Sequence, residues 1–421
     1  MKILVVGSGA REHALVTSLK ADESVGRIIC APGNAGIARD VETRNLDSTN
    51  AHAIADLASG LEVDLVVIGP EVPLVAGAAD AVRARGIACF GPSAAAAQIE
   101  GSKAFAKQVM DEAGVDTARA RVCGVMVEVE EALDEFDAPH VVKDDGLAAG
   151  KGVVVTNDRD EALAHAQACL SRGGDARVVI EEYLDGPEVS LFGITDGTTI
   201  IPLEPAQDFK RAYDGDAGPN TGGMGAYSPL PWAPPTLVAD VTERVLQPMI
   251  DTMRERGTPF VGLLYAGLAL TTRGTRVIEF NARFGDPETQ VVLARLASPL
   301  AQVLSAAATG TLGDLPPLAW HRGAAVTVVI ASKGYPENPL TGDRIEGLDE
   351  AGGVEGVTVL HAGTRATADG IVTAGGRVLS ITAQGESLAQ ARKRAYEALD
   401  CIGIEGAHHR SDIARAAAPD A

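Results

Sequence analysis

The sequence predicts a multidomain protein that combines α/β and α+β units. First, residues 1–100 alternate short apolar strands with amphipathic stretches, a pattern typical of a parallel α/β sheet. Second, further groups of strands and helices follow from residues 121, 193 and 321. Third, 421 residues with 46% hydrophobic content are enough for about three or four domains.

The N-terminal unit, residues 1–100, is expected to be Rossmann-like, and residues 101–120 to form a linker helix. The helical pattern covers Ser102 to Ala113 and stops before Gly114. Within the N-terminal unit, an amphipathic stretch covers Leu74 to Arg85. The expected strands are Lys2 to Val6, Arg27 to Ala31, Asp64 to Ile68 and Ala88 to Phe90.

The rest of the chain divides into a small unit at 121–192, a larger unit at 193–320 and a C-terminal α/β unit at 321–421. The larger unit holds a helix from Thr236 to Arg256 and a polar, glycine-rich loop from Asp208 to Ser228, whose length is typical of functional or disordered loops. We expect the C-terminal unit, with a helix from Leu388 to Leu399, to pack against the N-terminal unit. Further strands are expected near Val141, Val153 and Val178, at Ile200 to Leu203, Leu263 to Leu270 and Thr275 to Phe280, and near Val326 and Val378.

The composition excludes several classes of protein. The formal net charge of −21 repels nucleic acid and anionic membranes, so we expect neither as a partner. The first strand begins at once, without a signal peptide, and no stretch approaches about 18 uninterrupted apolar residues, so we expect a cytoplasmic protein. Five scattered cysteines favour buried thiols over disulfides or a zinc site.

Lysine is rare in this chain, so its placement is informative. There are nine lysines against 27 arginines, and six of the nine lie in or beside the motifs described below. A compact ammonium suits a phosphate where a bulky guanidinium does not. The six are Lys103, Lys107, Lys143, Lys151, Lys210 and Lys333, and we expect Lys333 to bind substrate.

A first glycine motif, Gly7-Ser8-Gly9-Ala10-Arg11-Glu12, follows the first strand and opens a helix. Backbone N–H groups at such a helix start hold phosphate. As a dinucleotide fingerprint the motif fails, because Glu12 occupies the position of the third glycine. A single phosphate near Gly9 and a plain tight turn both remain open.

A second glycine motif, Gly146 to Gly152, joins two expected strands. It has neither the spacing nor the hydroxyl residue of a P-loop. One interpretation is a mobile hairpin that folds over phosphates and supplies amides and Lys143; the other is a flexible hairpin without a ligand. The ATP-binding candidates within it are Gly150, Lys151 and Gly152.

The segment from Val179 to Leu184 ends an expected apolar strand. The carboxylate of Glu181 and the backbone of Tyr183 and Leu184 could bind the edge of an adenine. Glu188 follows within reach of ribose hydroxyls. An edge strand with exposed acids explains this segment equally well.

The segment from Ile278 to Glu288 is the most specific in the chain. Glu279 and Asn281 are two residues apart on a strand and therefore point to one face, where two oxygen ligands can bind Mg²⁺ while phosphates and waters complete the octahedron. Arg283 follows on that face, where it could bind a carboxylate or developing phosphate charge. An exposed polar strand end does not explain so many charged groups.

The long loop contains Asp208, Lys210 and Arg211, followed by a glycine-rich stretch from Gly218 to Tyr227. Lys210 and Arg211 supply positive charge, and Asp208 could accept from an amine. The glycines could let backbone amides approach an anion, although loop flexibility explains them nearly as well.

Together these segments resemble the ATP-grasp family and, within it, the phosphoribosylamine–glycine ligases, over essentially the whole chain. Several of the matching segments are long. They are Gly7 to Leu15, Ala31 to Gly36, Gly69 to Glu71, Gly101 to Lys107, Asp145 to Val153, Glu181 to Ser190, Gly218 to Pro229 and Glu279 to Gln290.

The resemblance implies an ATP-grasp fold with a pre-ATP-grasp N-terminal domain, in which residues 121–192 and 193–320 form the small and large lobes around ATP. It assigns ATP phosphates to Lys103 and Lys143, adenine to Glu181, Tyr183 and Leu184, ribose to Glu188, and Mg²⁺ or Mn²⁺ to Glu279 and Asn281. It assigns the ribose phosphate of the acceptor to Gly9, Ala10, Arg11 and Glu71, and the reacting groups to Asp208, Lys210, Arg283 and Asp286.

The implied reaction joins glycine to 5-phosphoribosylamine at the expense of ATP through glycyl phosphate, a step of de novo purine biosynthesis. We expect a monomer that makes transient contacts with neighbouring enzymes of that pathway. One alternative is another ATP-grasp ligase with a different acceptor, which the stretch from Gly218 to Pro229 disfavours. A second is a nucleotide-binding oxidoreductase or regulatory module on the N-terminal unit, which Glu12 and the Glu279–Asn281 pair disfavour.

The chain departs from the family's usual sequence at two positions. Asp144 replaces an alanine and adds a negative charge beside Lys143. Phe209 replaces a histidine and removes a possible donor, which puts in doubt any proton transfer by that side chain.

Overall fold

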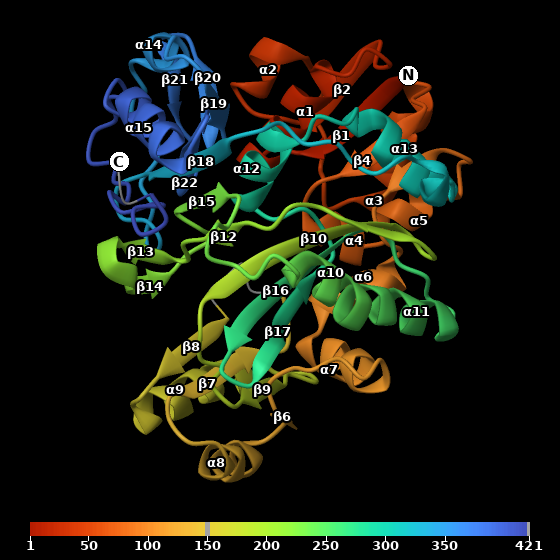
Figure 1. Cartoon of the computed structure of the whole chain (residues 1–421), viewed down its shortest axis with the longest axis vertical. Helices are drawn as coiled ribbons and strands as arrows, with labels where there is room; N and C mark the ends of the chain where they lie inside the picture. Colours follow the sequence, from red (N-terminus) through yellow and green to blue (C-terminus); the bar gives the residue numbers. More distant parts are fainter. Residues whose placement is uncertain (148–151, 419–421) are drawn as a thin grey trace.

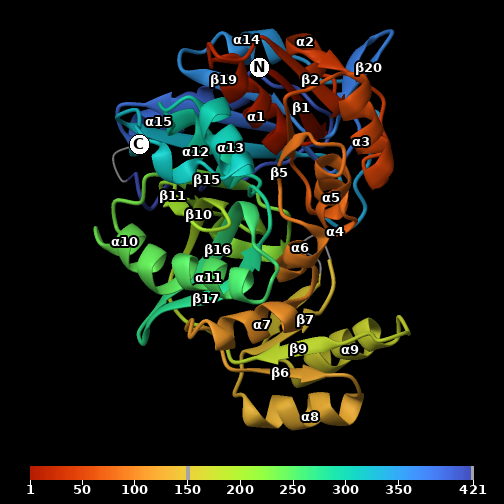
Figure 2. The ribbon, with the colours of Figure 1, turned by 90° about the vertical axis from the view of Figure 1, so that its right-hand side faces the viewer.

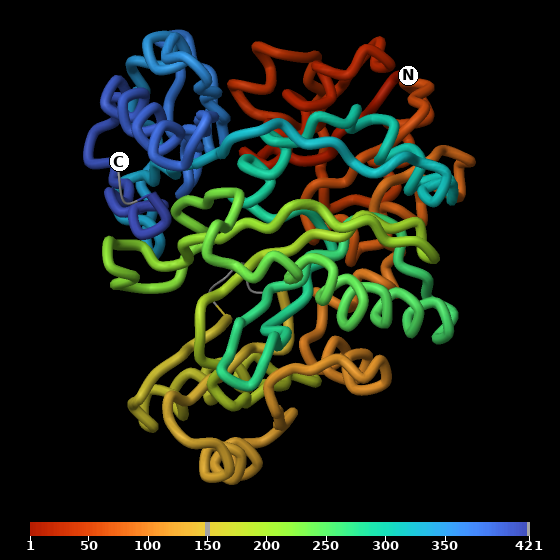
Figure 3. Tube along the Cα trace, in the orientation of Figure 1, coloured from red at the N-terminus to blue at the C-terminus, as the bar shows by residue number. Residues whose placement is uncertain are grey.

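The computed structural model describes residues 1–147 and 152–418. The N-terminal and C-terminal units lie side by side at one end of the molecule, and the small unit lies at the other end (Figures 1 and 2). The chain trace in Figure 3 runs from the N-terminal unit to the small unit, returns through the central sheet and ends in the C-terminal unit. The central sheet therefore lies between the small unit on one side and the N-terminal and C-terminal units on the other.

The N-terminal unit is the predicted parallel sheet, in the strand order β3-β2-β1-β4-β5. Its apolar strands are almost fully buried between helices. One prediction was too simple: the stretch from Leu74 to Arg85 is two helices, because Gly77 interrupts it with φ +84°. The elements are β1 (Lys2–Gly7), α1 (Ala10–Lys20), β2 (Arg27–Pro32), α2 (Ile37–Asp40), β3 (Glu42–Thr43), α3 (Ala51–Gly60), β4 (Leu65–Ile68), α4 (Glu71–Val75), α5 (Ala78–Arg83), β5 (Ala88–Phe90) and α6 (Ala94–Gly101).

The linker helix α7 (Lys103–Glu112) begins and ends where the sequence predicted. The hydroxyl of Ser102 accepts from the N–H of Phe105, a cap worth about 1 kcal/mol. The helix ends before Gly114, which has φ +65°.

The small unit has an apolar core of its own, made by an antiparallel sheet in the order β6-β9-β7-β8 with two helices on one face. Figure 2 shows α8 at the end of the small unit away from β17 and α9 beside β9. The elements are β6 (Ala120–Cys123), α8 (Met126–Glu135), β7 (His140–Asp144), β8 (Val153–Thr156), α9 (Arg159–Leu170) and β9 (Val178–Glu181).

The central sheet is antiparallel in the order β11-β10-β16-β17. The predicted helix from Thr236 to Arg256 is confirmed as a continuous run with a π-helical turn, η2, in its middle. The elements are β10 (Glu188–Asp196), β11 (Ile200–Pro202), α10 (Leu237–Val241), η2 (Thr242–Leu246), α11 (Gln247–Glu255), β16 (Val261–Thr271), β17 (Gly274–Asn281), α12 (Glu288–Arg295), α13 (Leu300–Thr309) and η3 (Leu312–Asp314).

The segment from Asp208 to Ser228 is not a single irregular loop, and that prediction was wrong. Its backbone groups pair in short strands, and the partner of β15 lies about 100 residues later in the chain, at β18. The glycines and prolines of this segment do not indicate strands, because both residues are rare in strands. The strands form here because a distant part of the chain pairs with them. The elements are β12 (Gln207–Asp208), β13 (Arg211–Tyr213), η1 (Asp214–Asp216), β14 (Ala217–Asn220) and β15 (Gly225–Ser228).

The C-terminal sheet, in the order β12-β15-β18-β22-β19, draws strands from both sides of residue 320. It packs against the N-terminal unit, as predicted: the His361 N–H donates to His13 Nδ1 at 2.8 Å, and Asn34 Nδ2 donates to the His361 carbonyl at 2.8 Å. The elements are β18 (Ala324–Ala331), α14 (Leu348–Gly352), β19 (Val357–His361), β20 (Thr364–Thr367), β21 (Gly370–Thr373), β22 (Arg377–Gly385) and α15 (Leu388–Leu399).

Two expectations drawn from composition can be compared with the fold. Among the described residues, no helix has both the length and the apolar character needed to cross a membrane. Cys401, just after α15, is exposed, so the expectation of buried thiols fails there. It holds for Cys30, Cys89, Cys123 and Cys169.

Candidate functional site

A cleft lies where the small unit and α7 face the central sheet. The space inside it that water can occupy is about 40 Å³. The small unit contributes strands β7 and β9, and the central sheet contributes β17. Its charged and amide side chains are Glu100, Lys103, Lys107, Lys143, Glu181, Glu279 and Asn281. The structure thus brings the predicted phosphate lysines and the predicted metal ligands to one place.

Glu181 binds two lysines at the floor of this cleft. Its Oε2 lies 2.8 Å from Lys143 Nζ, and its Oε1 lies 3.0 Å from Lys107 Nζ. Lys143 Nζ also donates to the Ile278 carbonyl of β17 at 3.0 Å. Burial lowers the pKa of Lys107, and Glu181 opposes that shift. Glu181 therefore holds two cations in place inside the cleft.

Lys107 was missed as a site residue, although the sequence holds a signal for it. It lies four residues after Lys103 on α7, and residues four apart share one face of a helix. Any prediction that places Lys103 in the cleft should therefore place Lys107 there too.

The base of the glycine hairpin is bound to the start of α7. Asp145 Oδ1 accepts from the Ala104 N–H at 2.7 Å and from Ser102 Oγ at 3.1 Å, while Lys103 Nζ donates to the Gly146 carbonyl at 3.1 Å. At the other end, the Gly152 carbonyl accepts from the Asp144 N–H at 2.8 Å. The candidates Gly150 and Lys151 lie outside the described residues.

Glu279 and Asn281 have the donor set that Mg²⁺ prefers. They are opposite Gly267 and Tyr265 of β16, both are half-buried, and both line the cleft. Burial alone would raise the pKa of Glu279, but Lys210 and Lys143 hold it below its usual value, so the carboxylate is ionised. Among the described residues, no three His, Cys, Asp or Glu side chains gather as metal ligands, so a metal here would need further oxygens from a bound phosphate.

Arg283 is bound by two carboxylates from the N-terminal half. Its Nη2 lies 2.8 Å from Glu100 Oε1, and its Nε lies 3.1 Å from Glu71 Oε2. Burial raises the pKa of Glu100, whereas Arg283 and Arg11 hold the pKa of Glu71 below its usual value against the effect of burial. The predicted Glu71 and Arg283 thus meet each other. Glu100 was missed, because nothing in its alanine-rich helix indicates a functional residue.

Asp208, Lys210 and Glu188 form a second polar group, beside the cleft. Lys210 makes an ion pair with Glu188, which was predicted to bind ribose. Burial raises the pKa of Asp208 to about 7, with Lys210 opposing the shift and Glu288 and Glu188 adding to it. Glu288, missed by the sequence reasoning, is buried and accepts from the Tyr265 hydroxyl at 2.6 Å. Its signal was weak, a glutamate at the first position of a helix.

The other adenine candidates, Tyr183 and Leu184, follow β9, which ends at Glu181. The side chain of Tyr183 is largely exposed. Neither residue belongs to the set that lines the cleft with Glu181.

The glycine turn after β1 is filled by Glu12. Its Oε2 accepts from the Gly9 N–H at 2.6 Å, and its Oε1 binds Arg11 Nε at 2.5 Å. A Cβ at Gly69 would lie 2.0 Å from Glu12 Oε1, so that glycine is needed to make room for the carboxylate. The carboxylate of Glu12 thus lies at the positive N-terminal end of α1. Acceptor binding by Gly9, Ala10 and Arg11 stays a prediction.

Two predicted residues lie toward the C-terminal unit. Asp286, between β17 and α12, has its Oδ1 bound by Gln290 Nε2 at 2.8 Å and by Arg377 Nη1 at 3.2 Å. Lys333 is exposed in the turn after β18, where its side chain packs beside Gly406. Within the described part of the chain, Lys333 makes no hydrogen bond or ion pair with Asp286, so its substrate role stays a prediction.

The structure explains both departures from the family's usual sequence. Asp144 makes an ion pair with Arg172 of the small unit, so its charge is balanced away from Lys143. The ring of Phe209 lies 4.9 Å from the guanidinium of Arg410. Phe209 is half-buried and packs against the apolar core, so its ring has a structural role.

A cleft between two lobes, with lysines from the small lobe and the linker helix α7 on one side and an oxygen-ligand pair from the large lobe on the other, is typical of the ATP-grasp class. The chain matches three models of one family along its length: the phosphoribosylglycinamide synthetase N domain at residues 1–100, its ATP-grasp (A) domain at 101–289 and its C domain at 325–416. The chain belongs to the phosphoribosylglycinamide synthetase family, and it is an ATP-grasp enzyme.

Relatives and solved structures agree with this membership. The chain is 64% identical to a phosphoribosylamine–glycine ligase of Streptomyces coelicolor, over 99% of this chain and 100% of that protein, and 58% identical to one of Leifsonia xyli, over 98% and 99%. The crystal structure of the Thermotoga maritima phosphoribosylamine–glycine ligase superposes with a TM-score of 0.85 at 31% identity, covering 98% of this chain and all of that one. A Campylobacter jejuni biotin carboxylase shares the fold, with a TM-score of 0.73 at 16% identity over 97% and 92%.

Proposed function

We propose that this enzyme joins glycine to 5-phosphoribosylamine, with cleavage of ATP to ADP and phosphate, and so carries out a step of de novo purine biosynthesis. The observation that carries the proposal is the cleft in which Lys103 and Lys143 face the Glu279–Asn281 pair across the two lobes. Full-length identity of 64% to a protein named for this activity supports the choice of substrates.

We assign ATP to this cleft, with its phosphates toward the lysines. Lys143 is fixed by Glu181 and the Ile278 carbonyl, so it provides a preorganised positive charge where phosphate charge develops. Glu279 and Asn281 would hold Mg²⁺ or Mn²⁺, which neutralises phosphate charge when bound. Glu181, Tyr183, Leu184 and Glu188 are the residues that we assign to adenosine.

The carboxylate of glycine needs activation, because a free carboxylate does not react with an amine at neutral pH. Its oxygen attacks the γ-phosphorus of ATP, the bond to the bridging oxygen breaks, and ADP and glycyl phosphate result. Glycyl phosphate would hydrolyse in water, so the step needs a site from which water is excluded.

The amine of 5-phosphoribosylamine then attacks the acyl carbon of glycyl phosphate. A carbon–nitrogen bond forms, the bond to the phosphate oxygen breaks, and one proton leaves the nitrogen. Asp208, whose pKa is raised to about 7 by burial, is suited to accept that proton near neutral pH. Lys210, Arg283 and Asp286 are the residues that we assign to the groups around this step, and Gly9 to Arg11 and Glu71 to the ribose phosphate.

The first experiment measures phosphate release from ATP and Mg²⁺ by the purified protein, with glycine alone and with glycine plus freshly generated 5-phosphoribosylamine. We expect release that needs both substrates and yields glycinamide ribonucleotide. Release that needs a different acceptor would replace the proposal with another ATP-grasp ligase. Absence of ATP binding would refute the assignment of the cleft.

A further inference from the structure

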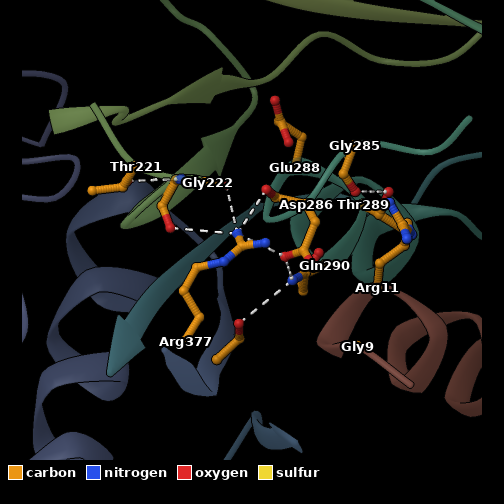
Figure 4. Close-up of polar contacts among 12 residues, drawn as sticks. Gly9, Arg11, Thr221, Gly222, Gly285, Asp286, Glu288, Thr289, Gln290 and Arg377 are labelled. Carbon is orange, nitrogen blue, oxygen red and sulfur yellow. Dashed lines mark hydrogen bonds and ion pairs between the residues drawn. The ribbon is translucent and has the colours of Figure 1, made fainter. Parts of the chain in front are cut away.

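Arg377, the first residue of β22, reaches from the C-terminal unit into the segment between β17 and α12 (Figure 4). Its Nη1 donates to the Gly222 carbonyl at 2.6 Å and to the Asp286 carbonyl at 2.8 Å, and it lies 3.2 Å from Asp286 Oδ1. One guanidinium therefore connects the C-terminal unit to two segments that are far apart in the sequence.

A bulge in the C-terminal sheet directs this contact. The pairing of β22 with β18 shifts register next to Arg377, between Ile330 and Ala331. Residues three apart on a regular strand face opposite sides, but a bulge brings them to one side. Ser380, three residues after Arg377, also meets α12: its Oγ lies 3.4 Å from Gln290 Nε2. The bulge thus turns two polar side chains of β22 toward the start of α12.

These contacts orient the carboxylate of Asp286. Oδ1 is held by two donors, Gln290 Nε2 at 2.8 Å and Arg377 Nη1 at 3.2 Å. The described residues donate no hydrogen bond to Oδ2, which lies 3.5 Å from the position that a Cβ on Gly9 would take. Oδ2 therefore faces the N-terminal unit at the start of α1, on the side away from the donors of Oδ1.

The backbone around Gly222 and Gly223 packs directly on this carboxylate segment. A Cβ on Gly223 would lie 2.4 Å from Pro287 Cδ, and one on Gly222 would lie 3.0 Å from the Arg377 guanidinium carbon. The glycines let the backbone approach Asp286 and Arg377 closely. Neither an anion nor mere flexibility is needed to explain them.

We propose that Arg377 is a positioning residue, which holds Asp286 so that Oδ2 accepts a hydrogen bond from the acceptor substrate. The substrate group must carry N–H or O–H donors, which the amine and hydroxyls of the ribosylamine provide. The lysine-lined ATP cleft is formed by other elements, so Arg377 acts on the acceptor and not on ATP. This inference depends on the proposed function and gives the C-terminal unit a role in it.

The test is steady-state kinetics of Arg377→Met and Arg377→Lys with each of the three substrates varied in turn. We expect Arg377→Met to raise KM for 5-phosphoribosylamine by about tenfold, with KM for ATP and glycine changed by less than about twofold. Arg377→Lys, which keeps a charge and donors, should recover part of the loss. Arg394→Met is the matched control, because Arg394 binds the Gln384 carbonyl and Glu355 in the same unit.

A double-mutant cycle separates positioning from general loosening. Asp286→Asn should give the same selective rise in KM, and the double variant should be no worse than the poorer single variant. The proposal would be overturned if the rise in KM of the double variant equalled the product of the rises in the two single variants. It would also be overturned if KM rose alike for all three substrates. If Arg377→Met does not fold, Gln290→Met removes the other donor to Oδ1, and an unchanged KM for the amine in that variant would also overturn it. Wild-type enzyme that makes no glycinamide ribonucleotide would instead refute the proposed function.

Discussion

The ATP cleft and the junction around Asp286 are built in different ways. In the cleft, Lys143 and Glu181 lie on neighbouring strands, and Glu279 and Asn281 lie two residues apart on one face of a single strand. At the junction, Arg377 meets Gly222 and Asp286, which lie 155 and 91 residues away from it in the sequence. The cleft depends on side chains within short motifs, and the junction depends on backbone carbonyls from distant segments.

This difference separates two kinds of functional residue. In the cleft, charged side chains pair with other charged groups, and the residue types alone indicate such a site. The junction holds a carboxylate in one orientation, and only the folded chain indicates which arginine does so. Substitutions in the cleft should therefore alter stability and catalysis strongly, whereas substitutions at the junction should alter orientation and give smaller, more selective effects.

The largest effect is expected for Glu181→Ala. It removes the partner of Lys143 and Lys107 and leaves two buried cations uncompensated, which costs about 3–5 kcal/mol. The free energy of opening of the small unit, measured by hydrogen exchange in β7 and β9, should fall by that amount. Glu131→Ala is the control, because its ion pair with Arg121 is exposed and worth about 1 kcal/mol or less. Equal losses in both variants would contradict the description of the cleft.

The next effect in size is expected for Glu279→Ala. Loss of an oxygen ligand beside the phosphates should lower kcat by about 10²-fold or more, as for other preorganised charge stabilisers. Turnover measured against Mg²⁺ concentration should show partial recovery at high metal. Glu243→Ala, at an exposed position of the same unit, should leave turnover unchanged. Near-normal turnover of Glu279→Ala would mean that the metal assignment is wrong.

A smaller effect is expected at the junction for Gly223→Ala. Gly223 has φ +107°, and the new Cβ would lie 2.4 Å from Pro287 Cδ, so strain and clash should cost about 1–3 kcal/mol. Gly257→Ala is a matched control, because Gly257 also has positive φ but open space around it. Thermal unfolding of the two variants isolates the clash from the cost of positive φ alone. An unfolding midpoint of Gly257→Ala that is lower than that of Gly223→Ala would contradict the close packing at Pro287.

The difference between the two regions also explains how much could be predicted from the sequence. Alternation of short apolar strands with amphipathic stretches identified the parallel sheet, and Ser102 and Gly114 marked the ends of α7. The strand period of two placed Glu279 and Asn281 on one face. Each of these signals lies within a few residues, so the sequence contains it directly.

Other features depend on contacts that no local pattern contains. The segment from Asp208 to Ser228 was predicted to be a loop, since β15 finds its partner only in β18. Arg377 shows no local signal, because its partners Gly222 and Asp286 lie far from it in the sequence. The glycine turn was ambiguous, because Glu12 fills it from within the same motif.

Asp208, on β12, is not among the residues that line the cleft, and its titration gives the smallest expected effect. Burial raises its pKa to about 7, Lys210 opposes the shift, and Glu288 and Glu188 add to it. Below that pH Asp208 carries a proton and cannot accept one from the attacking amine, and above it the carboxylate can. Between pH 8 and pH 6 the rate of the amine step should therefore fall by about tenfold.

The matched experiment compares the wild-type enzyme with Asp208→Asn over the same pH range, with 5-phosphoribosylamine freshly generated at each pH. Both enzymes experience the same protonation and breakdown of the substrate, so the ratio of their rates reports the enzyme alone. That ratio should rise with pH through about 7, as expected for a base with the pKa of Asp208. A ratio that is independent of pH would remove Asp208 from the proton transfer. The asparagine variant would then lose only the negative charge that Asp208 places near Lys210.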